Sequence, residues 1–206
     1  MVPTGRAIIA VDGIDGAGKT RFAADFAAVV RESGRAAFTA SIDGFHRPRA
    51  ERYRLGRDSP EGFYRDSYDY DAFARALIAP FRDGAQTAAT TGFQTEVWDL
   101  AADAPTEARW LTGPREAVLI VDGIFLHRPG LAELWDWSVL LEVTPDTAQA
   151  RLAARDGADP DPAAPSNRRY REGQRLYAAA AKPWEAASVI VDNNDVAHPV
   201  RMRGTR

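Results

Sequence analysis

The amino-acid sequence predicts an α/β fold with a mostly parallel sheet of five strands and helices on both of its faces. Short apolar runs alternate along the chain with longer segments whose apolar residues recur at helical spacing, which is typical of repeated strand–helix–strand units. The runs at 7–11 and 117–121 are continuously apolar, as expected of strands that are covered on both faces. No internal repeat or linker divides the 206 residues, so we expect one domain over residues 1–206.

The expected elements follow one another in a regular order. Each expected strand is a short apolar run, and the strands cover residues 6–12, 35–42, 117–121, 137–143 and 187–191. Each expected helix has an apolar face, a capping residue or both, and the helices cover residues 19–33, 71–81, 131–134, 144–155 and 167–181. A further strand or hairpin is expected within 91–100. The residues after about Asp195 carry no such pattern and are expected to be loosely attached.

The ends of the expected helices carry residues that favour a start or a stop. Gly34 is placed to end the first helix. Asp71 and Thr144 are typical N-cap residues for two of the later helices. These signals leave two long polar stretches between the elements, an arginine-rich segment over 44–70 and a loop rich in Pro, Asp and Ala over 156–166. The second of these is placed to act as a mobile lid.

Composition and charge exclude several classes of protein. The formal net charge is −3, so the chain has no overall basic field for nucleic acid. Cysteine is absent, which excludes disulfides and thiol nucleophiles, and the three histidines lie far apart in the sequence. No apolar stretch is long enough to span a membrane, and no signal-peptide pattern is present. We therefore expect a cytoplasmic protein without a membrane or nucleic-acid partner, and the sequence leaves a homo-oligomer open.

A glycine-rich stretch between the first expected strand and helix carries the strongest functional signal. Residues 13–20 read Gly-Ile-Asp-Gly-Ala-Gly-Lys-Thr and fit the pattern G-x-x-x-x-G-K-[ST] in full. Glycines let backbone N–H groups turn inward around a phosphate, and the helix that follows points its positive end at the same anion. The residues expected to bind a nucleoside triphosphate are Gly13, Ile14, Asp15, Gly16, Ala17, Gly18, Lys19 and Thr20.

Two residues of this stretch and one distant carboxylate have specific expected roles. Lys19 is expected to bridge the β- and γ-phosphates, and Thr20 to bind Mg²⁺. Asp122 ends the apolar run at 117–121, which is the Walker B arrangement of a strand followed by a carboxylate. Such a carboxylate lies near the Thr20 hydroxyl and holds Mg²⁺ directly or through water. The glycine stretch and Asp122 therefore predict the three-layer fold of P-loop NTPases.

Four further motifs follow one another through the chain. They read Ser-Ile-Asp-Gly-Phe-His-Arg at 41–47, Tyr-Arg-Asp-Ser-Tyr-Asp-Tyr-Asp-Ala-Phe at 64–73, Val-Asp-Gly-Ile-Phe at 121–125 and Arg-Leu-Ala-Ala-Arg-Asp at 151–156. Together with the glycine stretch they resemble the motifs of the uridine kinase and phosphoribulokinase superfamily of P-loop kinases over about residues 7–192. The resemblance implies a kinase that uses ATP and Mg²⁺ to phosphorylate a hydroxyl of a small molecule, with a nucleoside as the first expected acceptor.

The resemblance also implies roles for residues on the acceptor side. Asp43 aligns with the catalytic aspartate of the family, and a carboxylate is the kind of group that takes a proton from a hydroxyl as it attacks the γ-phosphate. Asp69 aligns with the carboxylate that holds ribose hydroxyls in nucleoside kinases. Phe45 and His46 are expected to edge the acceptor pocket, and Trp98 to stack on a ring of the acceptor.

An arginine-bearing lid is expected over about residues 155–172. Arginines on a closing lid neutralise charge on the transferred phosphoryl group and exclude the water that would hydrolyse ATP. Arg155 and Arg169 are the strongest candidates for this role. An acceptor-binding insert is expected over about residues 44–70, and its residues 56–62 match no motif of the family.

Other functions stay open on the sequence alone. The segment before the strand at 117–121 lacks the histidine with which uridine kinases read the base, so nicotinamide riboside, a sugar or pantothenate is an alternative acceptor. A second alternative is a nucleotide-sensing P-loop module without an organic acceptor, which would have no need of Asp43. Nucleic-acid binding through the arginines of 47–57 is disfavoured, because acidic residues offset them.

Overall fold

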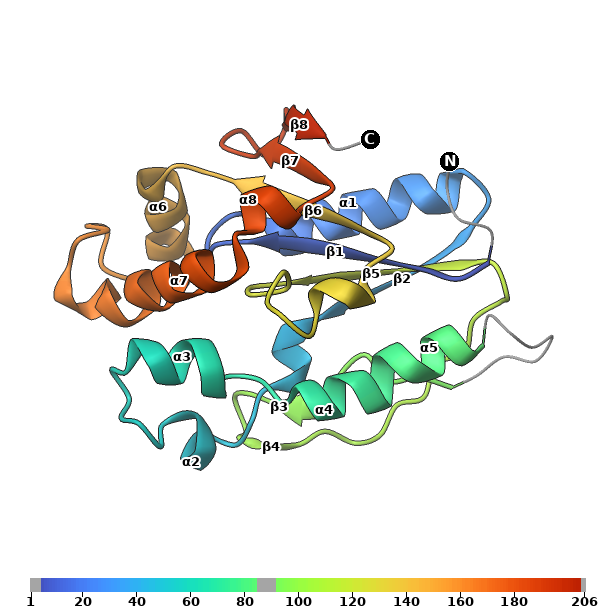
Figure 1. The fold of residues 1–206 in the computed structure, drawn as a ribbon, viewed down its shortest axis with the longest axis horizontal. Coiled ribbons are helices and arrows are strands. Elements are labelled where there is room, and N and C mark those ends of the chain that lie inside the picture. The colour runs from blue at the N-terminus through green and yellow to red at the C-terminus, as the bar shows by residue number, and fades with distance from the viewer. Residues whose placement is uncertain (1–4, 85–91, 205–206) are drawn as a thin grey trace.

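The computed structural model describes residues 5–84 and 92–204, and its centre is a six-stranded sheet (Figure 1). The strands lie in the order β2, β5, β1, β6, β7 and β8. All neighbouring pairs are parallel except β7 and β8, which are antiparallel. The predicted α/β fold with a mostly parallel sheet is therefore confirmed. The bounds are β1 Ala7–Gly13, β2 Ala36–Ser41, β5 Ala117–Gly123, β6 Trp137–Glu142, β7 Val189–Asp192 and β8 Val200–Gly204.

Strand β8 differs from the expectation of five strands followed by a loosely attached segment after Asp195. Its residues pair with β7 at the edge of the sheet. The side chains of Val200 and Met202 are 60% and 59% exposed, so backbone hydrogen bonds rather than burial of these side chains hold the strand in place. A search for buried apolar runs does not find a strand whose apolar residues, Val200 and Met202, are exposed.

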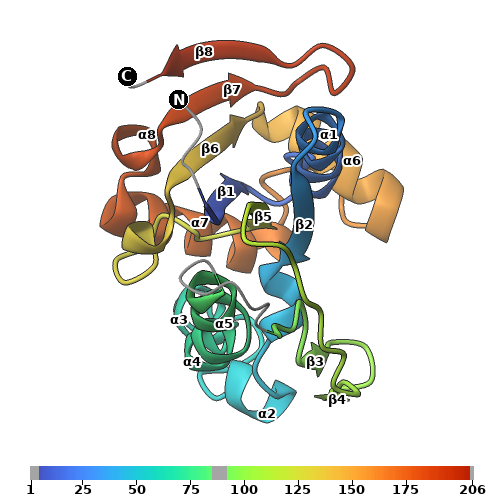
Figure 2. The same cartoon turned by 90° about the vertical axis from the view of Figure 1, so that its right-hand side faces the viewer.

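Apolar side chains cover the sheet on both faces, and Figure 2 shows helices on each side of it. Side chains of β1 alternate between them, with Ile8 in one layer and Ile9 in the other, which explains why a buried parallel strand is apolar throughout. One face packs against α1, Lys19–Glu32, through its Phe22 and Phe26. The other face packs against several helical segments, among them α4 Tyr70–Phe73, the π-helical segment η2 Ala74–Ile78, α5 Ala79–Asp83 and α7 Arg168–Ala181.

The helix expected over 71–81 forms, but its cap is not the predicted one. Asp69 rather than Asp71 is the N-cap, and its Oδ1 accepts a hydrogen bond from the Ala72 backbone N–H at 2.8 Å. Both aspartates are acceptable caps by residue type, and the structure decides between them because the chain turns at Asp69. The predicted apolar face is confirmed, since Phe73, Leu77, Ile78 and Phe81 are all buried.

The segment expected to be irregular over 44–70 contains short helices. They are the 3₁₀ turn η1 Ile42–Phe45, α2 Arg49–Arg52 and α3 Pro60–Asp66. A short hairpin lies in the second described range, 92–204, where β3 Trp98–Asp99 pairs with β4 Ala104–Pro105. The strand expected within 91–100 is therefore present as β3, its partner strand lies beyond that range, and Thr91 lies outside the described residues.

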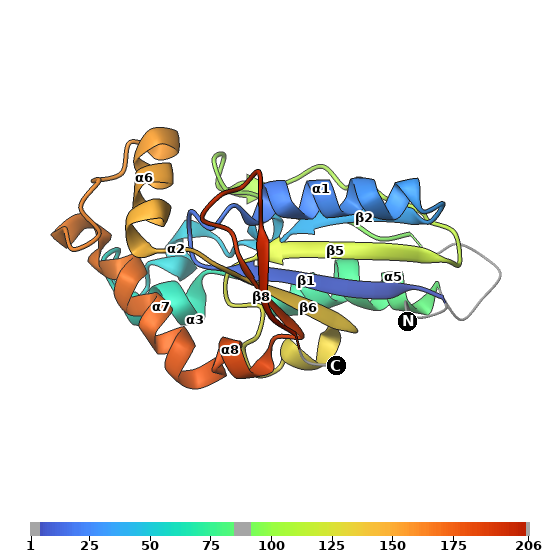
Figure 3. The ribbon, with the colours of Figure 1, turned by 90° about the horizontal axis from the view of Figure 1, so that it is seen from above.

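The remaining elements gather at one end of the sheet. Figures 1 and 3 show α2, α3, α6 and α7 beyond the carboxyl ends of the parallel strands. Helix α6, Pro145–Asp156, ends at Gly157, whose φ of 67° is easily adopted by glycine. The expected lid region then runs through the 3₁₀ turn η4, Pro165–Asn167, into α7. The other described helices are η3 Ala132–Leu134 and α8 Pro183–Ala186, and no described helix is long and apolar enough to cross a membrane.

Candidate active site

The glycine loop lies between the end of β1 at Gly13 and the start of α1 at Lys19. Gly16 and Gly18 have φ values of 78° and 86°, in the left-handed region that glycine adopts most easily. A Cβ on Gly16 would also collide with the backbone of Ala148, so the turn accepts glycine alone at this position. The fold therefore requires the same small residues that phosphate binding requires.

Two side chains, one from the start of α1 and one from the segment after β7, donate hydrogen bonds to the glycine loop. The Lys19 ammonium donates a hydrogen bond to the carbonyl oxygen of Ile14 at 2.8 Å, which folds the side chain across the loop. Asn193, just after β7, donates through Nδ2 to the carbonyl oxygen of Ala17 at 2.7 Å. Both contacts occupy carbonyl oxygens of the loop, and the first keeps the Lys19 ammonium beside the loop, where a P-loop lysine can bind phosphate oxygens.

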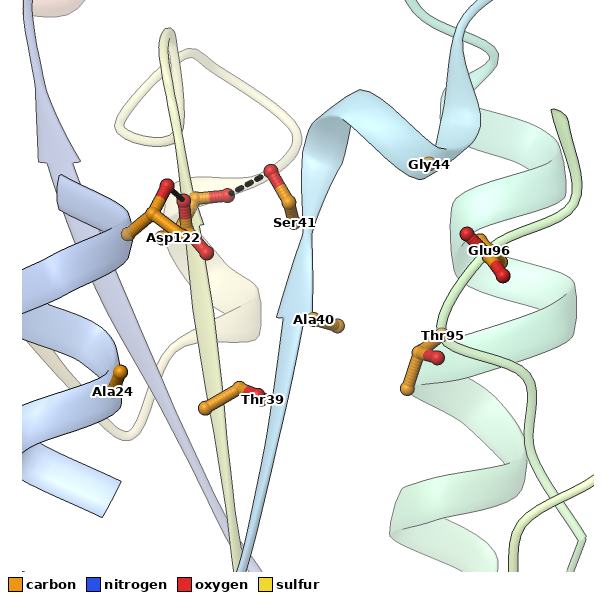
Figure 4. Close-up of a pocket in the computed structure, with 9 residues that line it drawn as sticks. Ala24, Thr39, Ala40, Ser41, Gly44, Thr95, Glu96 and Asp122 are labelled. Carbon is orange, nitrogen blue, oxygen red and sulfur yellow. Dashed lines mark hydrogen bonds between the residues drawn. The ribbon is translucent and has the colours of Figure 1, made fainter. Parts of the chain in front are cut away.

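Thr20 and Asp122 meet beside the loop. The Thr20 hydroxyl donates to Oδ2 of Asp122 at 2.8 Å, and the Ser41 hydroxyl donates to the Asp122 carbonyl oxygen at 3.4 Å (Figure 4). Burial raises the pKa of the Asp122 carboxyl, so a cation beside it would favour the ionised form. Mg²⁺ in phosphoryl-transfer sites takes one or two carboxylates together with phosphate oxygens, and this pair of oxygens fits such an ion. A cavity of about 260 Å³, lined by Thr20, Ser41, Gly44 and Asp122 among others, opens beside the pair.

Asp43 lies in η1, directly after β2. Its Oδ1 accepts a hydrogen bond from the Tyr68 hydroxyl at 2.9 Å, and its side chain lines an adjacent cavity of about 350 Å³. Burial raises the pKa of Tyr68 well above its usual value, so the hydroxyl keeps its proton and acts as the donor. Tyr68 therefore orients the carboxylate that the sequence predicts as the base.

We expect Tyr68→Phe to lower kcat about tenfold, because a hydrogen bond to a charged group contributes roughly 1.5–3 kcal/mol. The aromatic ring would keep its contact with His46, whose ring centroid lies 4.5 Å away. Tyr70→Phe is the matched control, since the Tyr70 hydroxyl accepts a hydrogen bond from Arg128 instead. Steady-state kinetics on both variants separate the two roles, and an equal loss in kcat for both would contradict the positioning role of Tyr68.

Asp15 belongs to the glycine loop, yet its side chain lines the cavity of Asp43. Its Oδ2 is buried and finds no hydrogen-bond partner among the described residues. Burial raises the pKa of the Asp15 carboxyl; Lys19 opposes this shift and Asp43 adds to it. The sequence predicts Asp15 as a nucleotide contact. In the structure its side chain lines the cavity of about 350 Å³ that also contains Asp43.

We expect Asp15→Asn to gain thermal stability relative to the parent protein as the pH rises. Burial holds the pKa of Asp15 in the folded protein above its ordinary value, so the carboxyl ionises first in the unfolded chain as the pH rises. At a pH below the pKa of Asp15 in the unfolded chain, the carboxyl is protonated in both states and its burial costs no charge. At a pH above the pKa in the folded protein, the carboxyl is ionised in both states and the folded protein bears the full cost of burying the charge. The Tm difference should therefore be larger at about pH 8 than at about pH 5. Asp25→Asn, on the exposed surface of α1, is the control, and a difference that shrinks with pH would contradict the expectation.

The other residues predicted on the acceptor side fall into two groups. His46 lines the cavity of Asp43, and its Nδ1 donates to the Asp43 carbonyl oxygen at 2.8 Å. Phe45 is fully buried in the core, Asp69 caps α4, and Trp98 lies in β3. These three side chains are not among those that line the cavity. Their contacts with an acceptor stay predictions.

The two lid arginines lie at different distances from this cavity. Arg169 lines it, from the first turn of α7. Arg155 forms an ion pair with Asp156 at 2.7 Å, and this partner is the main reason that its pKa is raised. The charges of Asp15 and Asp43 contribute to the same shift, so the Arg155 guanidinium also lies within electrostatic reach of the carboxylates. Arg169 therefore shares the cavity of the candidate base, whereas Arg155 is not among the residues that line it and interacts with the base through its charge.

Some residues of the cavity are missed by sequence reasoning. Arg49, Arg52 and Tyr53 come from the arginine-rich insert and line the cavity beside Asp43. Their signal in the sequence is a run of arginines offset by nearby acids, which is equally typical of a solvated surface. Packing of α2 and α3 against one end of the cavity, rather than any motif, turns these side chains toward Asp43.

A buried polar network beneath the glycine loop is also missed. Oδ2 of Asp12 accepts hydrogen bonds from Nδ1 of His127 at 2.7 Å and from the Tyr177 hydroxyl. The other His127 nitrogen, Nε2, lies 3.0 Å from the Ser138 hydroxyl, and Oδ1 of Asp12 accepts from the Gly13 N–H at 2.7 Å. Because Asp12 is fully buried and directly precedes the loop, this network fixes the point where the loop begins.

Comparison with known proteins finds matches among solved structures alone. No protein family model and no curated protein matches the chain. A possible uridine kinase from Bacillus stearothermophilus has a TM-score of 0.67 and 19% identity, over 92% of this chain and 90% of that chain. A protein described as a fructose transport system kinase from a Silicibacter species has a TM-score of 0.57 and 27% identity, over 90% and 87% of the two chains. Phosphoribulokinase from Rhodobacter spheroides has a TM-score of 0.57 and 16% identity, over 91% and 70%. The chain thus shares its fold with small-molecule kinases.

Proposed function

We propose that this chain, which has the fold of the uridine kinase and phosphoribulokinase superfamily of P-loop kinases, transfers the γ-phosphate of ATP to a hydroxyl of a small molecule. The observation that carries the proposal is the position of Asp43, whose carboxylate lines a cavity of about 350 Å³ together with Asp15 of the glycine loop. A cavity of this size suits a small organic molecule. A nucleotide-sensing module has no use for an oriented carboxylate in such a place.

The residues divide the work of phosphoryl transfer. The backbone of the glycine loop binds the phosphates, and Lys19 balances charge on the transferred group. Thr20 and Asp122 would hold Mg²⁺, which neutralises charge on the phosphate oxygens. Asp43 accepts the proton of the acceptor hydroxyl as the hydroxyl oxygen bonds to the γ-phosphorus and the bond to ADP breaks. Arg155 adds positive charge and, with the loop after α6, keeps water away.

We also propose which small molecule accepts the phosphate. The nucleoside that the sequence resemblance implies is the first candidate, and nicotinamide riboside, sugars and pantothenate are the alternatives. Each offers a hydroxyl that Asp43 would deprotonate in the same way. Phosphoryl transfer to a hydroxyl therefore does not depend on which of them fits the cavity.

The proposal is tested by following ADP release from ATP and Mg²⁺ with and without each candidate acceptor. Uridine, cytidine, nicotinamide riboside, pantothenate and free sugars form the first panel. Acceptor-dependent turnover, with the phosphorylated acceptor identified by mass spectrometry, is the expected result. Hydrolysis of ATP that no acceptor stimulates would instead favour the nucleotide-sensing module.

A further inference from the structure

The cavity beside Asp43 has a basic end that phosphoryl transfer alone does not require. Arg49 and Arg52 reach it from α2, and Arg169 reaches it from α7. These three guanidinium groups outnumber the two carboxylates, Asp15 and Asp43, that line the same cavity. The chain as a whole has a net charge of −3, so the local excess of positive charge is a property of the cavity rather than of the composition.

Two of the arginines are held in place by aromatic stacking. Arg52 is 7% exposed, its Nε donates to the Arg47 carbonyl oxygen at 2.8 Å, and its guanidinium carbon lies 5.3 Å from the centre of the Tyr53 ring. The guanidinium carbon of Arg169 lies 5.1 Å from the centre of the same ring. Guanidinium groups fixed in this way lose little freedom when they bind, and their planar fork matches phosphate and carboxylate oxygens.

The arginines have few acidic partners among the described residues. Arg52 forms one ion pair, with Asp103 at 3.5 Å. Nε of Arg169 is buried and lacks a hydrogen-bond partner in residues 5–84 and 92–204. The guanidinium of Arg49 forms no ion pair with any described residue. Arg49 is exposed, whereas Arg52 and Arg169 are drawn together around the Tyr53 ring with the single long ion pair of Arg52 as counter-charge, and an incoming anion would add to it.

The two ends of the cavity differ in electrostatic character. At Tyr53, burial acts to raise the pKa of the hydroxyl, but the arginines around it, Arg169 first, lower it below its usual value. At the other end, burial raises the pKa of Asp15, and Asp43 raises it further. The pKa of His46 is lowered, mainly by burial; Asp43 opposes this shift and Arg52 and Arg169 add to it, so charges of both signs act on the ring. A bound molecule therefore meets both carboxylates and guanidinium groups in this cavity, and two of the guanidinium groups, Arg52 and Arg169, gather around Tyr53.

We infer that the acceptor is a hydroxyl-bearing anion whose phosphate or carboxylate group binds Arg49, Arg52 and Arg169 while a hydroxyl at its other end meets Asp43. The inference rests on the proposed kinase function and narrows its acceptor. A neutral nucleoside would shield the guanidinium groups from water without giving them a counter-ion. Phosphate and carboxylate share the acceptor geometry that a guanidinium recognises, so the test contains both.

Matched pairs of acceptors test the inference in the kinase assay. D-ribose 5-phosphate is compared with D-ribose, and D-glycerate with glycerol. The anionic member of at least one pair should have a kcat/KM at least about tenfold higher, because charge-assisted hydrogen bonds are the strong ones. A preference within the first pair identifies a phosphate as the recognised group, and a preference confined to the second identifies a carboxylate.

Variants of Arg49 connect the preference to the arginines. Arg49→Gln should raise the KM for the preferred anion about tenfold and leave kcat and the KM for ATP unchanged, because Arg49 would bind the anionic group of the acceptor rather than the transferred phosphoryl group. Arg49→Glu should abolish the preference over the neutral partner. Arg65→Gln is the matched control, since Arg65 is 66% exposed, pairs with Glu61 and is not among the residues that line the cavity.

Direct binding separates failure of this inference from failure of the kinase function. Calorimetry with the protein saturated by a non-hydrolysable ATP analogue and Mg²⁺ keeps the glycine loop occupied while D-ribose 5-phosphate, D-glycerate or inorganic phosphate is added. Binding that Arg49→Glu removes, without turnover of any acceptor, would support the anion site and overturn the kinase function. Turnover of neutral acceptors without a preference for anions, or no anion binding by the parent protein, would overturn the inference.

Discussion

Asp43→Asn is expected to lower kcat about 10²- to 10⁴-fold at saturating acceptor, which is the range that a positioned general base contributes. Asparagine keeps the size of the side chain and its ability to accept the hydrogen bond from Tyr68, which is 2.9 Å long in the parent protein. It cannot take the proton of an attacking hydroxyl. The loss should therefore appear in the chemical step and not in the fold.

Three measurements check this expectation. Single-turnover kinetics should show the slowed transfer, the affinity for ATP should be unchanged, and the Tm should stay close to that of the parent protein. Asp71→Asn removes a carboxylate from the first turn of α4 that the structure uses neither as the helix cap nor in the Asp43 cavity, and should leave kcat unchanged. Full activity in Asp43→Asn would remove the base from the mechanism and with it the central observation behind the kinase proposal.

Lys19→Met is expected to lower kcat about 10²- to 10³-fold, which is the usual loss when one preorganised donor to a developing negative charge is removed. The sequence offers an internal control, because Lys19 and Lys182 are its two lysines. Lys182 is 66% exposed and pairs with Glu185 at 3.6 Å, beyond the end of α7. Lys182→Met should therefore change neither kcat nor the KM for ATP. Similar losses from both substitutions would show that the effect is not specific to the glycine loop.

The parts of the molecule that the sequence predicts are those with local signals. The apolar runs of β1 and β5 predict central strands, because each side chain on both faces has to enter a core layer. The meeting of Thr20 and Asp122 is also predicted, because the carboxyl ends of adjacent parallel strands lie at the same edge of the sheet. Gly16 is predicted by phosphate chemistry, and the close backbone of Ala148 gives a second reason for it.

The parts that the sequence does not predict depend on contacts between distant segments. Arg49 and Arg169 are 120 positions apart and share one cavity because α2 and α7 are brought to the same end of the sheet. Tyr68 becomes the hydrogen-bond partner of Asp43 because the fold brings together two residues that are 25 positions apart in the sequence. The choice of Asp69 over Asp71 as the helix cap depends on the path of the chain rather than on residue type. None of these features has a periodic or compositional signature.

The network beneath the glycine loop has a consequence for how the protein is made. Asp12 leaves the ribosome early, but its partners His127 and Tyr177 follow 115 and 165 positions later. At roughly 5–20 residues per second, a nascent chain waits about ten to thirty seconds before Tyr177 is synthesised. Throughout that time the carboxylate that anchors the loop lacks its native partners. The native contacts of Asp12 are therefore completed late in biosynthesis, after most of the sheet has been synthesised.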